Sequence, residues 1–431
     1  YSGPSLHLVY TELLRAASDA EFTSDEVADY VKAWLDNAAL YGDRWLTQSR
    51  AKALAALDGQ KAYADLSVKL AKEADSATTD ETPTDQQAAI VAALARAAEL
   101  AGDEQLAAEA IARSEKLETQ LDEEYLASVP PFEPAPFEGR ASSEHDRALL
   151  LELFTGAQCP PCVAADVAFD AVVESYQPRV VVAWQYHLHI PGPDPLTSEA
   201  SNKRQAYYGV RGTPSTYFNG EDLAGGGGGM SGAEGKYAMY RSIINDRLNE
   251  AANAKIDLQV TRSGEKLIIN VSAQVDEAAL EAEPAADDAP AEEDAAEEEE
   301  KSNPEDGQEA DDGDEAEDKA PQLRLRLALT EESIRYVGGN DLRFHHHVVR
   351  EMPGGVEGKE LVAGQAQEEL TIDLAELRAS QEKYLADYAE TRSFPNPLPA
   401  IDLANLSVVA FVQNDATKEV LQAVSVAVEG D

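Results

Sequence analysis

Apolar side chains recur at intervals of three and four residues along the first part of the chain, as amphipathic helices require. Ser24 precedes one such pattern and is expected to start a helix. Two alanine-rich stretches, at 86–100 and 104–125, predict a helical hairpin. We therefore expect residues 1–128 to form a helical module that serves as a spacer or an interaction surface.

A proline-rich stretch follows, and residues 129–146 are expected to be a linker between domains. Beyond it, apolar runs of strand length alternate with a helical pattern, which is typical of an α/β domain over residues 147–254. The runs lie at 148–154 (strand), 164–176 (helix), 179–186 (strand), 216–218 (strand) and 236–253 (helix).

From Lys255 onward the apolar period changes to two, with short alternating runs around turn residues. This pattern predicts an all-β sandwich over residues 255–431. One segment interrupts it: residues 277–320 hold 21 acidic residues and only two lysines. Strong self-repulsion and few apolar side chains predict that this insertion is a disordered acidic loop.

The net charge of the chain limits the kinds of partner that it can bind. The chain of 431 residues carries a formal net charge of −46, with no block of basic residues. Such a field repels nucleic acid and anionic membrane surfaces, so we expect no nucleic-acid partner. No apolar run is long enough to span a bilayer, so no transmembrane segment is expected.

The chain has two cysteines, Cys159 and Cys162. The absence of other thiols suits an oxidising compartment, where stray cysteines would mispair. We therefore expect an extracytoplasmic location (periplasm, cell envelope or secreted). The sequence begins at Tyr1, which is compatible with a signal peptide or lipid anchor on a precursor.

The two cysteines form a Cys-Pro-Pro-Cys motif between a predicted buried strand and a predicted helix. Free N–H groups at a helix start stabilise a thiolate, so this position favours thiol–disulfide chemistry. Pro160 suits the first helical position, where its missing N–H costs nothing. A structural zinc site is the alternative for such a pair, but it needs four ligands and the chain has no further cysteine.

A second motif, Gly-Thr-Pro-Ser-Thr-Tyr-Phe-Asn-Gly, begins at Gly212. With both motifs in this order, the sequence resembles the thioredoxin-like superfamily. The resemblance implies that Cys159 is the attacking thiol and Cys162 the resolving thiol. It further implies that Pro214 is a cis-proline shaping substrate docking, and that Thr213 offers backbone hydrogen bonds to an extended peptide. No metal and no cofactor beyond the cysteine pair is implied.

Three further stretches narrow the resemblance. Glu-Leu-Phe-Thr-Gly at 152–156, Tyr-Tyr-Gly-Val at 207–210 and His-His-His-Val-Val-Arg at 345–350 are similar to sequences of a bacterial family related to outer-membrane protein twenty-eight. Members join a thioredoxin-like domain to a C-terminal immunoglobulin-like sandwich. Membership implies association with the cell envelope.

The sequence departs from thioredoxins at two positions. Gln158 stands where an aromatic residue usually precedes the first cysteine, and Leu153 stands where a buried acid helps the resolving thiol lose its proton. Glu152, one residue away, should face the other side of its strand. The proton acceptor is therefore not identified. His187 and His189, after the second strand, are candidate modulators of the Cys159 pKa, or else packing residues.

The histidines at 345–347 suggest a metal, but a strand places only His345 and His347 on one face, so a packing role is expected. The leading hypothesis is an exported thiol–disulfide oxidoreductase that exchanges disulfides with protein substrates and an unidentified redox partner. The alternative is a non-catalytic binding or scaffold protein of the envelope, in which the cysteine pair is a structural staple.

Overall fold

The computed structural model describes residues 4–140, 146–276 and 322–429, so the predicted acidic insertion at 277–320 lies outside these ranges. The chain divides into two compact units, Tyr1–Ser128 and Val129–Asp431. The first is helical, and the second contains a mixed sheet with helices followed by C-terminal strands. No helix of the described ranges combines the length and the hydropathy needed to cross a membrane.

The N-terminal unit packs its helices around an apolar core that includes Trp34, Val31 and Leu94. Its first long helix begins with a capping box, in which Thr23 and Glu26 satisfy each other's backbone N–H groups. The helix begins at Ser24, as predicted, and Thr23 is its cap. The helices are α1 (Pro4–Arg15), α2 (Ser24–Ala39), α3 (Asp43–Ala56), α4 (Ala64–Ser76), α5 (Thr84–Ala101) and α6 (Glu104–Ser128).

A nine-stranded sheet forms the centre of the second unit, in the order β12-β11-β7-β8-β2-β1-β3-β4, with β9 paired to β7. The parallel pair β1–β2 lies inside it, which explains why both strands read as continuous apolar runs. Its strands are β1 (Leu149–Thr155), β2 (Val181–His187), β3 (Ser215–Phe218), β4 (Glu221–Asp222), β7 (Leu323–Arg335), β8 (Phe344–Glu351), β9 (Lys359–Glu360), β11 (Leu406–Asn414) and β12 (Val420–Ala427).

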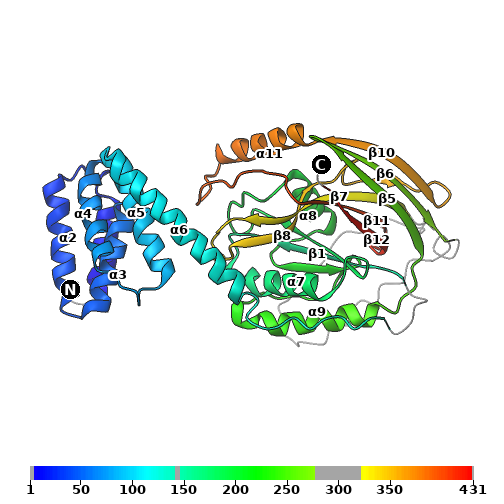
Figure 1. The fold of residues 1–431 in the computed structure, drawn as a ribbon, viewed down its shortest axis with the longest axis horizontal. Coiled ribbons are helices and arrows are strands. Elements are labelled where there is room, and N and C mark those ends of the chain that lie inside the picture. The colour runs from blue at the N-terminus through cyan, green and yellow to red at the C-terminus, as the bar shows by residue number, and fades with distance from the viewer. Residues whose placement is uncertain (1–3, 141–145, 277–321, 430–431) are drawn as a thin grey trace, which may run out of the picture. The chain divides into compact units, whose positions relative to one another are not determined.

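Helices α7 (Val163–Ser175) and α9 (Ala233–Arg247) lie along one side of β1 and β2 (Figure 1). Alternate residues of β1, such as Leu151 and Leu153, share a core with them. Leu150 and Phe154 point to the opposite face, into a core that includes Trp184 and Phe411. The short helix α8 (Glu199–Tyr208) joins β2 to β3.

Four of the longer C-terminal strands belong to the same sheet as β1 and β2. Strand β8 pairs with β2 through Gln185 and Val348, so β7, β8, β11 and β12 extend the sheet that begins with β1. A separate three-stranded sheet, β5 (Ala254–Ser263), β6 (Lys266–Val275) and β10 (Gln365–Asp373), packs with helix α11 (Leu374–Ala389) against β7, β11 and β12. The regions expected as two domains, 147–254 and 255–431, therefore share one sheet.

The proline-rich segment expected as a linker packs onto the second unit over its described part. Phe132 stacks on Tyr237, and Phe137 lies 5.0 Å from the ring of Tyr176. Residues 141–145 of the expected linker lie outside the described ranges. Along the chain, the first compact unit ends at Ser128 and the second begins at Val129.

A buried ion pair joins α8 to strand β1. Arg204 and Glu152 are both fully buried, 2.8 Å apart, and the hydroxyls of Tyr208 and Tyr186 also donate to Glu152. Arg204 donates as well to Gln413 of β11. The cluster thus connects the first and one of the last strands of the second unit, and it uses two of the motifs that carried the family resemblance.

Candidate functional site

The cysteine pair lies at the junction of β1 and α7. Cys159 begins a short 3-10 turn, Pro160–Cys162, which continues directly into α7. The two cysteines form a disulfide. Cys159 is 1% exposed and Cys162 is fully buried, although both prolines between them are exposed.

The loop before β3 lies against this disulfide. Cys159 Sγ is 3.7 Å from the backbone oxygen of Thr213, and the peptide bond between Thr213 and Pro214 is cis. The Thr213 hydroxyl lies within reach of two acceptors, Cys159 Sγ at 3.4 Å and Ile190 O at 3.2 Å. The two sequence motifs, about 50 residues apart, therefore meet in space.

A glycine-rich strap, residues 225–229, covers the start of α7. Gly228 N donates to Pro161 O at 2.6 Å, and Ala164 N donates to Gly228 O at 2.9 Å. Gly227 has to be glycine here, because a Cβ would lie 2.3 Å from Pro161 O. The buried ammonium of Lys236 donates to two carbonyl oxygens of the strap and holds it in place.

The strap and the loop before β3 border a groove of about 440 Å³, with Pro161 between them. The strap also changes the expected electrostatics of the helix start. The N–H of Ala164, one of the groups expected to be free for a thiolate, is already bonded to the strap.

His187 and Asp194 support the loop that carries the cysteines. Both are fully buried, with His187 Nδ1 2.9 Å from Asp194 Oδ2. The same carboxylate accepts from Ala157 N at 2.6 Å, two residues before Cys159. Burial disfavours the charge of Asp194, but His187 and the Leu196 and Ala157 amides outweigh burial and lower its pKa. No contact joins His187 to a cysteine among those the structure records.

His189 is directed away, toward α11. Its ring stacks on Tyr388 at 3.7 Å, and its Nε2 lies 2.9 Å from the Tyr384 hydroxyl. Nδ1 accepts from Asp194 N, so the ring is neutral with its proton on Nε2. Burial lowers its pKa to about 4. The geometry gives His189 a packing contact with α11 and brings it to no cysteine.

The two departures from thioredoxin have different surroundings. Gln158 Nε2 donates to the Tyr336 hydroxyl, and Gln158 Oε1 accepts from Gly339 N. This contact ties the cysteine loop to the β7–β8 turn. Leu153 lies in the apolar core with α7, while Glu152 faces the other side and bonds to Arg204.

A buried acid does lie near the cysteines, but on the helix. Asp166 of α7, four residues after Cys162, is 2% exposed. Neither of its carboxylate oxygens has a hydrogen-bond partner among the described residues, although the Thr155 hydroxyl is near enough to favour its charged form. Burial raises its pKa well above the usual range, and Asp170 and Asp194 raise it further. The Cys-x-x-x-Asp spacing was the available signal in the sequence.

The histidines of β8 have separate surroundings. His345 is buried, lies 4.8 Å ring to ring from His187, and has its pKa lowered to about 3, mainly by burial. His346 Nδ1 is 2.9 Å from Asp170 Oδ1, and this carboxylate raises the His346 pKa. His347 lies edge-on to Phe169. Within the described residues, no three potential metal ligands gather in one place.

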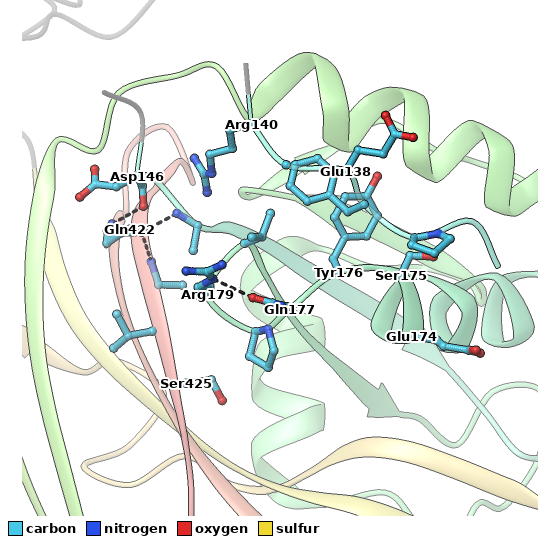
Figure 2. A pocket seen from close by; sticks show the side chains of 18 residues that line it. Glu138, Arg140, Asp146, Glu174, Ser175, Tyr176, Gln177, Arg179, Gln422 and Ser425 are labelled. Carbon is cyan, nitrogen blue, oxygen red and sulfur yellow. Dashed lines mark hydrogen bonds between the residues drawn. The ribbon is translucent and has the colours of Figure 1, made fainter. Parts of the chain in front are cut away.

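A larger cavity, of about 1160 Å³, opens at the other end of α7 (Figure 2). It is bordered by the segment 136–140, the turn before β2 and strand β12, with Arg140 and Arg179 among its charged residues. Neither cysteine borders it, and neither does the loop with Thr213.

Comparison with known proteins adds little. No protein-family model matches the chain, and no curated protein matches it. Among solved structures, HBP35 of Porphyromonas gingivalis matches with 14% identity and a TM-score of 0.42, over 67% of this chain and 77% of that one.

Proposed function

We propose that this protein is a thiol–disulfide oxidoreductase acting on protein substrates. The observation that carries the proposal is the Cys159–Cys162 disulfide at the start of α7, with Cys159 Sγ 3.7 Å from the Thr213 carbonyl. Backbone groups beside an attacking sulfur suit an extended polypeptide, and the adjoining groove of about 440 Å³ offers room for one.

In the proposed reaction the reduced enzyme attacks first. The Cys159 thiolate bonds to one sulfur of a substrate disulfide, and the other substrate sulfur leaves with the electron pair. Cys162 then attacks Cys159, the mixed disulfide breaks, and the substrate is released with both sulfurs reduced. The reverse sequence oxidises a substrate dithiol.

Trapping tests this proposal. A Cys162→Ser variant should accumulate a mixed disulfide between Cys159 and a substrate protein, because the resolving thiol is missing. The matched Cys159→Ser variant should accumulate far less, because Cys159 is the cysteine whose sulfur lies beside Thr213 of the loop before β3. Failure of the reduced Cys162→Ser variant to form any adduct, with disulfide-bonded insulin or with native extracts, would exclude the exchange mechanism.

One observation favours a second candidate, a binding or scaffold protein with a structural disulfide. Cys159 is only 1% exposed and the strap binds the start of α7, as a staple would require. The reduction potential separates the two candidates. A value below about −300 mV, with no insulin reduction, fits a structural disulfide, whereas a catalytic pair lies higher.

We further propose that residues 147–254 have a thioredoxin-like fold, that the C-terminal strands are immunoglobulin-like, and that the chain is related to the outer-membrane-protein-twenty-eight family. The β1–α7–β2 order with the cysteines at the start of α7 supports the first part. The disulfide chemistry also supports the proposal of an extracytoplasmic location. Fractionation of the native cells, with a cytoplasmic enzyme as marker, tests the location.

A further inference from the structure

One face of α7 carries a row of titratable groups that begins at the disulfide. Cys162, Asp166 and Asp170 follow one another at intervals of four residues, which places them on the same side of a helix. Exposure increases along the row. Cys162 is fully buried, Asp166 is 2% exposed, and the side chain of Asp170 is 20% exposed.

Asp166, the middle residue of the row, is buried without hydrogen bonds among the described residues that would stabilise a charged carboxylate. A buried carboxylate normally has a cation or several N–H groups as partners, since burial without them is costly. Both oxygens of Asp166 lack hydrogen-bond partners within the described ranges. A side chain that costs stability and makes no bond suggests a role in chemistry.

Burial and two neighbouring carboxylates discourage the ionisation of Asp166, and they outweigh the Thr155 hydroxyl, which favours it. Asp170 from the same helix and Asp194 from the loop after β2 act on it through their charges. Tyr240 of α9 lies near enough to be influenced by Asp166, and Thr155 contributes a hydroxyl from the end of β1. Asp166 therefore holds its proton at a pH where other aspartates do not, and its pKa moves toward that of a thiol.

The outer end of the row reaches solvent through β8. Asp170 Oδ1 is 2.9 Å from His346 Nδ1, and the His346 side chain is 30% exposed. These atoms are at ion-pairing distance, although the ring is not oriented for a hydrogen bond. An imidazole at the surface exchanges protons with water at neutral pH.

Resting on the proposed oxidoreductase function, we propose that Asp166 accepts the proton of Cys162 during resolution of the mixed disulfide, and that Asp170 and His346 pass it to solvent. In this step the Cys162 S–H bond breaks, its proton moves to the Asp166 carboxylate, and the Cys162 thiolate bonds to Cys159 Sγ. The Cys159–substrate bond breaks, and the substrate sulfur leaves with the electron pair. The reverse reaction returns the proton from Asp166 to Cys162.

A two-phase reaction with Ellman's reagent isolates the step. The first thionitrobenzoate released from the reduced full-length protein reports attack by Cys159, and the second reports resolution by Cys162. We expect Asp166→Asn to slow the second phase by roughly tenfold or more between pH 6 and 7. Its rate should then follow thiol ionisation at alkaline pH, while the first phase changes less than about twofold.

Further variants test whether the proton passes from Asp166 to solvent through Asp170 and His346. Asp170→Asn and His346→Gln should slow the second phase by a smaller factor, while Glu199→Gln, which alters an exposed acid of α8, should leave it unchanged. The infrared difference spectrum of wild type minus Asp166→Asn should contain a protonated-carboxyl band, because burial raises the pKa of Asp166. An unchanged second phase in Asp166→Asn, or no such band in wild type, overturns the assignment. Absence of both phases in wild type instead rejects the proposed function.

Discussion

Two buried carboxylates lie on opposite faces of the same sheet, and their surroundings differ completely. Glu152 of β1 accepts from Arg204, Tyr208 and Tyr186. Asp166 of α7 has no hydrogen-bond partner among the described residues. The first has every bond that a structural charge needs, and the second has none. The difference separates a residue kept for stability from one whose burial requires another explanation.

The largest effect should come from breaking the paired site. Arg204→Met leaves the Glu152 charge buried without a cation, and we expect a loss of about 3–5 kcal/mol in the free energy of unfolding. Chemical denaturation of the full chain measures it. The double variant Glu152→Gln, Arg204→Met should be more stable than Arg204→Met, because no unpaired charge remains. Equal stability of Arg204→Met and wild type would show that the pair does not stabilise the sheet.

The unpaired site should behave in the opposite way. Asp166→Asn removes a charge that has no partner, so we expect stability to rise by about 1–2 kcal/mol at pH 8. The pKa of Asp166 is raised in the folded protein, so wild type loses stability as pH rises above about 4, the ordinary value for aspartate. The gain in the variant should therefore be larger at pH 8 than at pH 5, as thermal unfolding at both values measures.

Asp194 is the matched control for that prediction, because its pKa is lowered although it is equally buried. Its contribution to stability is present above the ordinary aspartate pKa and disappears as pH falls through the lowered value. Asp194→Asn should therefore be destabilising at pH 7, and less so at low pH. If Asp166→Asn and Asp194→Asn shift stability in the same direction, the distinction between paired and unpaired carboxylates fails.

The sequence was sufficient for the local features of this comparison. The apolar run of β1, the helix after the cysteines and the opposite orientation of Glu152 and Leu153 all follow from periodicity. The Cys162-to-Asp166 spacing is equally local. From this spacing, Asp166 could have been predicted to be a buried acid on the helix, in place of the acid that thioredoxins have at the position of Leu153.

The long-range features could not be predicted in the same way. Arg204 reaches Glu152 across 52 residues of sequence, and Gln413 reaches Arg204 across 209. The union of the two expected domains depends on the pairing of β8 with β2 at Gln185 and Val348. Alternation shows that a strand exists, but it does not say which strand lies beside it.

The smallest effect should come from the outer end of the row on α7. Asp170 raises the pKa of His346, so their interaction stabilises the fold below the ordinary histidine pKa of about 6.5 and is lost as pH rises through the raised value. Asp170→Asn should therefore cost roughly 0.5–1 kcal/mol at pH 5.5 and almost nothing at pH 9. Titration of His346 by NMR should show its pKa fall in the variant. If the pKa of His346 does not change in Asp170→Asn, the two side chains do not interact, and His346 does not belong to the proposed proton path.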